Sequence, residues 1–189
     1  MSRRVYSFDP PDRFVCGAIG QPGQRTFFLQ ASKGQQVVSV ALEKVQVAAL
    51  AERLAALLLS LRERGVDVDW SREPDALPLV EPVFEQFRVG AMTLSWDEGR
   101  EQVLIEAREM TDADLEDEED EADEEIAAVR ADDADGPDLV RVTLELADAQ
   151  AFVTRAVAVV RAGRLPCPNC GEPLDPHGHF CVRRNGYAH

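Results

Sequence analysis

The distribution of charge along the chain most constrains which residues can fold together. The 189-residue chain has a formal net charge of −15, and fifteen of its acidic residues lie between Thr111 and Asp138, where Arg130 is the single base. Such a run of like charge buries too little apolar surface to offset the entropy lost on ordering. We expect a disordered acidic loop over 111–138, interpreted as a solubilising insertion. The alternative is an electrostatic arm for a basic partner, or for the basic tail of the chain itself at Arg161, Arg164, Arg183 and Arg184.

The remaining chain is close to neutral and 45% of all residues are apolar, so a core can form outside the acidic loop. In the first half, apolar runs separated by Gly- and Pro-containing turns predict strands at 14–20, 25–31 and 36–42. Apolar residues at three- and four-residue steps then predict a core-facing helix over 43–64.

The second half repeats this order of elements. Strands are predicted at 87–91, 102–107 and 139–146, followed by a helix over 148–162. Short segments of similar sequence accompany the repeated order of elements. Phe87-Arg88-Val89-Gly90-Ala91 matches Phe14-Val15-Cys16-Gly17-Ala18, Ile105-Glu106-Ala107 matches Leu29-Gln30-Ala31, and Val142 aligns with Val38.

These patterns predict an α+β fold of duplicated antiparallel strand-strand-strand-helix units that form one body. The units span residues 1–70 and 87–164, joined by a proline-containing linker over 71–86, and a tail over 165–189 follows. The alternative is that any two units of this composition look alike without a common origin.

The tail contains a candidate metal site. Cys167 and Cys170 form a C-P-x-C-G knuckle, a spacing that lets two thiolates bind one ion. His179 and Cys181 are two residues apart, so in an extended stretch both point to the same side. Together these four residues predict a closed Cys₃His site for a structural Zn²⁺, which would supply most of the folding energy of so short a tail.

Several alternatives to this site are open. His177 has the same parity as His179 and is the alternative ligand. The two knuckle cysteines are alternatively a redox dithiol, although the expected βαβ context is missing. A catalytic zinc with a bound water, and no metal at all, are the other possibilities. Cys16 stands alone in an apolar strand and is expected to be a small core residue.

The rest of the sequence contains few signs of catalysis. Motifs of the G-x-S-x-G, phosphate-loop and H-E-x-x-H types are absent. All three histidines lie in the tail, at His177, His179 and His189, which excludes histidine acid–base catalysis in the duplicated body. Asp67 and Asp69 are interpreted as solvated surface. The chain also lacks a long apolar run and an N-terminal signal pattern, so we expect a cytoplasmic protein without a membrane span.

The tail C-P-x-C-G-x-P-L-D-P-x-G-H-x-C, with Arg184-Asn185-Gly186-Tyr187 after it, resembles the actinobacterial family called domain of unknown function 3090. The segments Phe27-Phe28-Leu29-Gln30-Ala31 and Leu42-Glu43-Lys44-Val45-Gln46 also resemble that family. The resemblance covers nearly the whole chain, least of all the acidic loop. It implies no established activity and no catalytic residues.

Three functions are therefore considered. The first is a non-enzymatic, zinc-containing binding or adaptor protein with a protein partner. The second is a single-stranded nucleic-acid binder, in which Phe27, Phe28 and Phe87 stack on bases if they face outward; the near-neutral body does not favour it. The third is a metal-dependent hydrolase that uses the tail zinc. Whether the protein is an enzyme is left open by the sequence.

Overall fold

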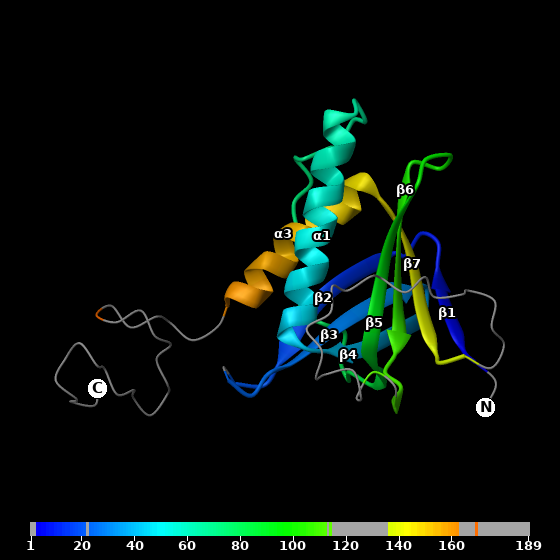
Figure 1. The fold of residues 1–189 in the computed structure, drawn as a ribbon. Helices are drawn as coiled ribbons and strands as arrows, with labels where there is room; N and C mark the ends of the chain where they lie inside the picture. Colours follow the sequence, from blue (N-terminus) through cyan, green and yellow to red (C-terminus); the bar gives the residue numbers. More distant parts are fainter. Residues whose placement is uncertain (1–2, 22, 113, 115–135, 163–168, 170–189) are drawn as a thin grey trace.

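A single mixed sheet organises the chain in the computed structural model, which describes residues 3–162 except 22, 113 and 115–135, together with Asn169. Seven strands occur in the order β1-β7-β6-β5-β4-β3-β2 across the sheet (Figure 1). The strands are β1 (Val5–Phe8), β2 (Arg13–Ile19), β3 (Thr26–Lys33), β4 (Gln36–Leu42), β5 (Glu85–Asp97), β6 (Gln102–Glu109) and β7 (Leu139–Glu145).

Two antiparallel meanders build this sheet. β2, β3 and β4 form the first, β5, β6 and β7 form the second, and β4 pairs with β5 in parallel to join them. β1 pairs in parallel with β7 at the far edge. The α+β class is confirmed. β1 was not predicted, because four residues before a proline turn give too short a pattern, and β5 extends well beyond the predicted 87–91.

Two helices cover the same face of the sheet and pack against each other, α1 (Lys44–Glu63) and α3 (Leu146–Arg161) (Figure 1). At the start of α1, the backbone N–H of Glu43 donates to the Gln46 side chain at 2.8 Å, which satisfies one of the free groups at a helix end. The same side chain donates to the Val89 carbonyl of β5 at 3.1 Å. One glutamine thus fixes both the first turn of α1 and its position on the sheet.

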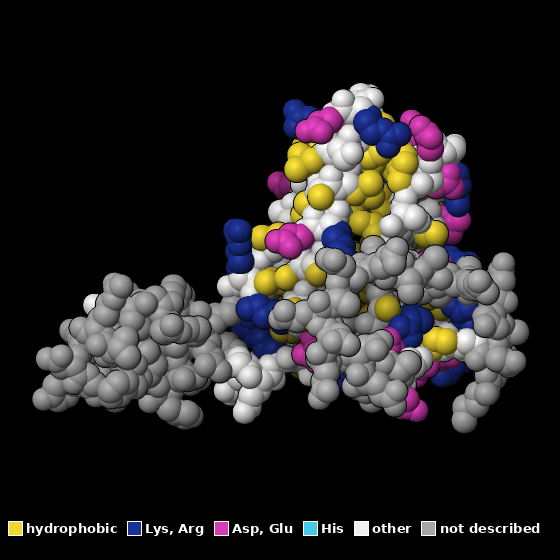
Figure 2. Space-filling view, viewed as in Figure 1, with side chains coloured by type: hydrophobic (Ala, Val, Ile, Leu, Met, Phe, Trp, Pro, Cys, Tyr) yellow, Lys and Arg dark blue, Asp and Glu magenta, His cyan; other side chains and the backbone are white. Residues whose placement is uncertain are grey.

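The main core lies between the helices and the sheet. Its fully buried members include Leu54, Leu58 and Leu61 of α1, with Ile105 and Leu144 from the strands. The long end of β5 extends this layer, where Met92, Leu94 and Trp96 are partly buried against the core. Apolar side chains reach the surface beside α1 in this region (Figure 2).

Residues 66–84, here called the crossing segment, begin in the main core at Val66 and Val68, run past the edge of β2, and cover the opposite face of the first meander from Leu79 on. Leu79 is 9% exposed and packs with Val15, Phe28 and Ala41 in a second apolar cluster. The buried Gln30 side chain accepts from the Val80 N–H at 2.8 Å and donates to the Val80 carbonyl at 3.1 Å. The amide thereby satisfies both backbone groups of Val80 as a neighbouring strand would.

β6 and β7 carry the acidic loop between them, and their ends are joined. The Glu109 N–H donates to the Asp138 carbonyl at 2.8 Å. Arg4 forms an ion pair with the Asp138 carboxylate at 2.8 Å, and the Leu139 N–H donates to the Arg4 carbonyl at 2.9 Å. The positions where the loop leaves and re-enters the sheet are therefore adjacent and tied down.

Gly17 is required by the crossing segment, and this can be tested. A Cβ atom at Gly17 would lie 2.7 Å from Leu79 Cγ, so we expect Gly17→Ala to lower the free energy of unfolding by roughly 1–3 kcal/mol through overpacking. Urea denaturation of Gly17→Ala in the wild-type and Leu79→Ala backgrounds measures the coupling. The cost should nearly vanish in the Leu79→Ala background; an equal cost in both backgrounds would contradict the packing described.

Candidate functional site

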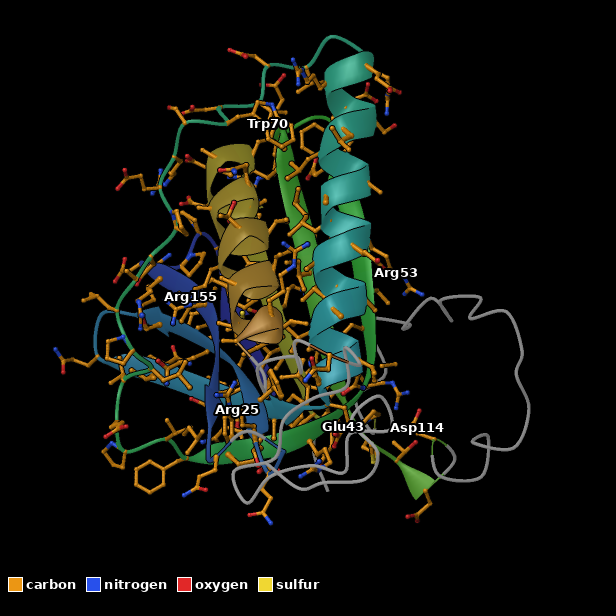
Figure 3. All side chains as sticks on the ribbon, turned by 90° about the vertical axis from the view of Figure 1, so that its left-hand side faces the viewer. Arg25, Glu43, Arg53, Trp70, Asp114 and Arg155 are labelled. Atoms are coloured by element: carbon orange, nitrogen blue, oxygen red, sulfur yellow. The ribbon has the colours of Figure 1, made fainter. Side chains whose placement is uncertain are left out.

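A groove of about 430 Å³ lies between α3, the start of β2 and residues 72–77 of the crossing segment. Its volume is within the range of small-ligand and peptide sites. β2 contributes Arg13 and Phe14, and α3 contributes Phe152 and Arg155, which extends from the helix toward β2 and the crossing segment (Figure 3). Three separate elements therefore meet at one opening.

Arg13, Asp75 and Arg155 form the floor of the groove. Arg13 Nε donates to Asp75 Oδ2 at 2.6 Å and Arg13 Nη2 donates to Asp75 Oδ1 at 3.1 Å, a two-pronged pair. The same Nη2 donates to the carbonyls of Leu77 and Pro78 at 2.8 and 3.0 Å. One guanidinium thus binds four acceptor atoms of the crossing segment and holds it beside β2.

Arg155 connects the third element. Its Nε donates to the Cys16 carbonyl of β2 at 2.7 Å, and its Nη1 donates to the Asp75 carbonyl and lies 3.4 Å from Asp75 Oδ1. The side chains of Arg13 and Arg155 are only 16% and 11% exposed. Two largely buried cations therefore share one carboxylate, so these three groups together carry a net positive charge. The wider lining also includes Arg72 and the carboxylates of Asp12, Glu73 and Asp148.

Burial and pairing shift the acid–base properties of these groups in opposite directions. The hydrogen bond from Arg13, opposed by burial and assisted by the Leu77 N–H, lowers the pKa of Asp75. Burial lowers the pKa of Arg155, although the charge of Asp75 acts to raise it. Burial also raises the pKa of the Cys16 thiol to about 11, so that thiol is neutral at pH 7.

The walls of the groove combine an aromatic pair with a more exposed ion pair. The rings of Phe14 and Phe152 stack with their centroids 4.8 Å apart. At the rim, Arg72 lies 2.8 Å from Asp148, in the first turn of α3, where a carboxylate also interacts favourably with the helix dipole. The groove therefore offers apolar contact beside charged groups.

The described residues show no arrangement for covalent or acid–base catalysis at this groove. They include no histidine, the Cys16 thiol is buried and neutral, and the Asp75 carboxylate is held by two arginines. The arrangement instead provides recognition chemistry, namely arginines beside an aromatic wall.

The predicted metal ligands Cys167, Cys170, His179 and Cys181, and the alternative His177, all lie outside the described residues. Within the described part of the chain, no group of three or more His, Cys, Asp or Glu side chains is arranged to hold a metal ion. The zinc site stays a prediction from the tail sequence.

The proposed base-stacking residues are not available at the surface. Phe27, Phe28 and Phe87 are 5%, 7% and 4% exposed, because they pack in the two apolar clusters. The condition attached to the nucleic-acid alternative, that these rings face outward, is therefore not met. The prediction for Cys16 is confirmed, since its side chain is fully buried in the main core. Among the described helices, none has the length and apolar character needed to span a membrane.

Sequence reasoning did not find Arg13, Asp75 and Arg155. They are far apart in the chain and form no motif. One signal was present, since Arg155 follows Phe152 by three residues and places a charge beside the apolar stripe of α3. The sequence does not reveal that Asp75 is a partner of Arg155, because their contact depends on the path that the crossing segment takes through the fold.

The fold and groove define an α+β protein with one mixed sheet, a two-helix layer and a charged groove at the sheet edge. A family model described as protein of unknown function (DUF3090) matches residues 6–181. The chain therefore belongs to this family, as its tail and helix-start motifs indicated. No curated protein and no solved structure matches it significantly.

Asp75 should make stability depend on pH. Because its pKa is lowered on folding, its contribution is present above the unfolded pKa near 3.8 and is lost as the pH falls through the lower folded value. We expect Asp75→Asn to be destabilised at pH 7 by roughly 1–3 kcal/mol, since two buried guanidinium groups lose their counter-charge. Chemical denaturation at pH 7 and pH 3 measures both effects.

The matched control is Glu73→Gln, an exposed acid that also lines the groove. This variant should change little at either pH. If Asp75→Asn and wild type lose the same stability between pH 7 and pH 3, the role assigned to this carboxylate is refuted.

Proposed function

We propose that this protein is a non-enzymatic binding module that engages a protein partner through the groove between α3, β2 and the crossing segment. The observation that carries this proposal is the groove itself, where two largely buried arginines share one carboxylate beside a stacked aromatic pair. Arginine and aromatic side chains are the residue types enriched at the centres of protein interfaces.

The chemistry of the groove supports binding over catalysis. Its charged groups are fixed by packing and hydrogen bonds, which lowers the entropy lost when a partner is bound. The described residues contain no paired nucleophile and base. The burial of Phe27, Phe28 and Phe87 also removes the stacking surface on which a nucleic-acid role was based.

Groove dependence can be tested with two leucines of similar exposure. Leu77 is 66% exposed and lines the groove, whereas Leu59 on α1 is 51% exposed and does not line it. Affinity capture from the native cell, quantified by mass spectrometry, should recover a partner with wild type and Leu59→Glu. Leu77→Glu should reduce its recovery by about tenfold, because a buried unpaired carboxylate costs at least the corresponding 1.4 kcal/mol.

Equal recovery by both variants would locate the partner elsewhere. A low-salt gel shift with single-stranded DNA and RNA completes the test, because retardation by the protein would favour the nucleic-acid alternative instead.

We further propose that the tail over 165–189 holds a structural Zn²⁺ through Cys167, Cys170, His179 and Cys181, with His177 as the alternative imidazole. The support is the C-P-x-C-G knuckle followed by a histidine and a cysteine two residues apart. Three thiolates and one imidazole make a closed tetrahedral set without an open position, which argues against a hydrolytic role for the ion.

Metal analysis of untagged protein is expected to give about one zinc per chain. Cys170→Ser should lose the metal and make the tail sensitive to protease. The melting temperature of the sheet domain should stay nearly unchanged, because the sheet and its two helices form the main core described above. His177→Ala and His179→Ala, measured in parallel, identify the ligand. A metal-free wild-type protein with a protease-resistant tail would overturn the site.

We also propose that the two halves arose by duplication, and the register supports this. Gln30 pairs with Ser39 as Glu106 pairs with Arg141, and Ala31 pairs with Val38 as Ala107 pairs with Val140. The helix caps Glu43 and Glu145 follow the same spacing.

The strand register also corrects the alignment of the two halves that was predicted from the sequence. The counterpart of Val38 is Val140, two residues before the predicted Val142, which keeps the side chain on the same face. Phe14 lies opposite Ala31 and Met92 lies opposite Ala107, so Phe87 is not the counterpart of Phe14.

A further inference from the structure

The open edge of the sheet runs along the groove. β2 is the outermost strand on its side, and Arg13, Phe14 and Val15 of this strand line the opening. An edge strand carries backbone N–H and C=O groups that point away from its neighbour and can pair with another extended chain. Which residues of β2 carry them follows from the register.

The turn between β3 and β4 fixes the direction of each residue. Only two residues separate Lys33 from Gln36, and Gly34 has φ +57°, as in a tight hairpin. The two residues that flank such a turn exchange both backbone hydrogen bonds. In β3, the odd-numbered residues, such as Leu29, therefore direct their backbone N–H and C=O groups toward β4. The even-numbered residues of β3 direct their backbone groups toward β2, where Gln30 pairs with Val15.

It follows that Phe14 and Cys16 direct their backbone groups to the open edge. Arg155 independently supports this direction, because its Nε donates to the Cys16 carbonyl at 2.7 Å from outside the sheet. In the described part of the chain, the Phe14 N–H and C=O make no hydrogen bond outside the sheet, and since Cys16 is fully buried, only the Phe14 groups face the groove. These unpaired groups lie beside Arg13 and Arg155.

The crossing segment shows what this floor binds. Asp75 places its carboxylate on Arg13 and Arg155, and the carbonyls of Leu77 and Pro78 accept from Arg13. Asp75, an acidic residue in a segment without helix or strand structure, is thus already bound by these two arginines. Of the other carboxylates lining the groove, Asp148 pairs with Arg72 and Asp12 accepts from the Gly34 N–H. The local excess of two guanidinium groups over the Asp75 carboxylate therefore favours a second acidic group beside Arg13 and Arg155.

We infer that the groove binds an extended peptide with an acidic side chain, which pairs with the β2 edge at Phe14 and places its carboxylate against Arg13 and Arg155. This inference rests on the binding role proposed above and names the class of partner. Backbone pairing supplies affinity and the charged floor supplies specificity, as in other cases of strand addition. A second copy of the sheet fits less well, because residues 72–77 and Arg155 flank the edge.

The probe is a phage-displayed library of random hexapeptides, selected on the full-length protein. We expect enriched sequences with one Asp or Glu among β-branched residues. Four synthetic versions of the best peptide then test the geometry by fluorescence anisotropy. The first two are the parent and an analogue in which the acid is replaced by its amide. The other two are N-methylated, one on the odd-numbered and one on the even-numbered residues, so each has lost the backbone N–H donors along one edge of the extended peptide.

The amide analogue and one methylated form should each bind about tenfold more weakly, as expected for loss of a charged contact or of backbone hydrogen bonds. The other methylated form should bind like the parent, since its methyl groups face away from β2. Asp75→Asn should bind the parent several-fold more tightly, because the internal carboxylate no longer competes. Circular dichroism confirms that this variant is folded.

Three outcomes would overturn the inference: no enriched peptide, equal weakening by both methylation patterns, or tighter binding of the amide analogue. A concentration-dependent dimer that blocks peptide binding would assign the edge to a second copy instead. If the peptides fail while partner capture still depends on Leu77, the groove remains a binding site and only the strand-addition geometry is wrong.

Discussion

The hydrogen bonds of Arg155 hold together three parts of the molecule that no other described side chain joins in this way. One guanidinium links α3 to the Cys16 carbonyl of the sheet edge and to Asp75 of the crossing segment. A buried cation is costly unless its donors are satisfied, so the path of the crossing segment and the position of α3 depend on each other. The groove exists because these elements meet around this charge.

Much of the fold could be predicted from local patterns. The leucine spacing of α1, the turns around Gly34 and Gly99, and the alternation in β3 and β4 each follow from short-range physics, and the structure confirms the α+β class. The short β1 could not be predicted, because its pairing with β7 joins residues more than a hundred positions apart. The length of β5 was also missed, although its signal was present, because Met92, Leu94 and Trp96 alternate with polar residues as in a half-buried strand.

The candidate groove was beyond reach for a different reason. Arg13 and Asp75 look like ordinary surface charges in the sequence, and only the return of the crossing segment along β2 makes them partners. Similarly, the chain region around Leu79 reads as a linker because its prolines exclude helix and strand. In the fold, Gln30 replaces the missing strand partner with its own amide, and an irregular segment becomes part of the packed structure.

The closure between Glu109 and Asp138 has a consequence for how this fold varies in size. Because the two strand ends are hydrogen-bonded directly, the pairing of β6 with β7 does not depend on how many residues lie between them. The entropy of closing a loop rises only slowly with its length. Relatives with a much shorter or longer stretch here should keep the same sheet, and a reporter domain grafted at this position should leave the neighbouring strands in place.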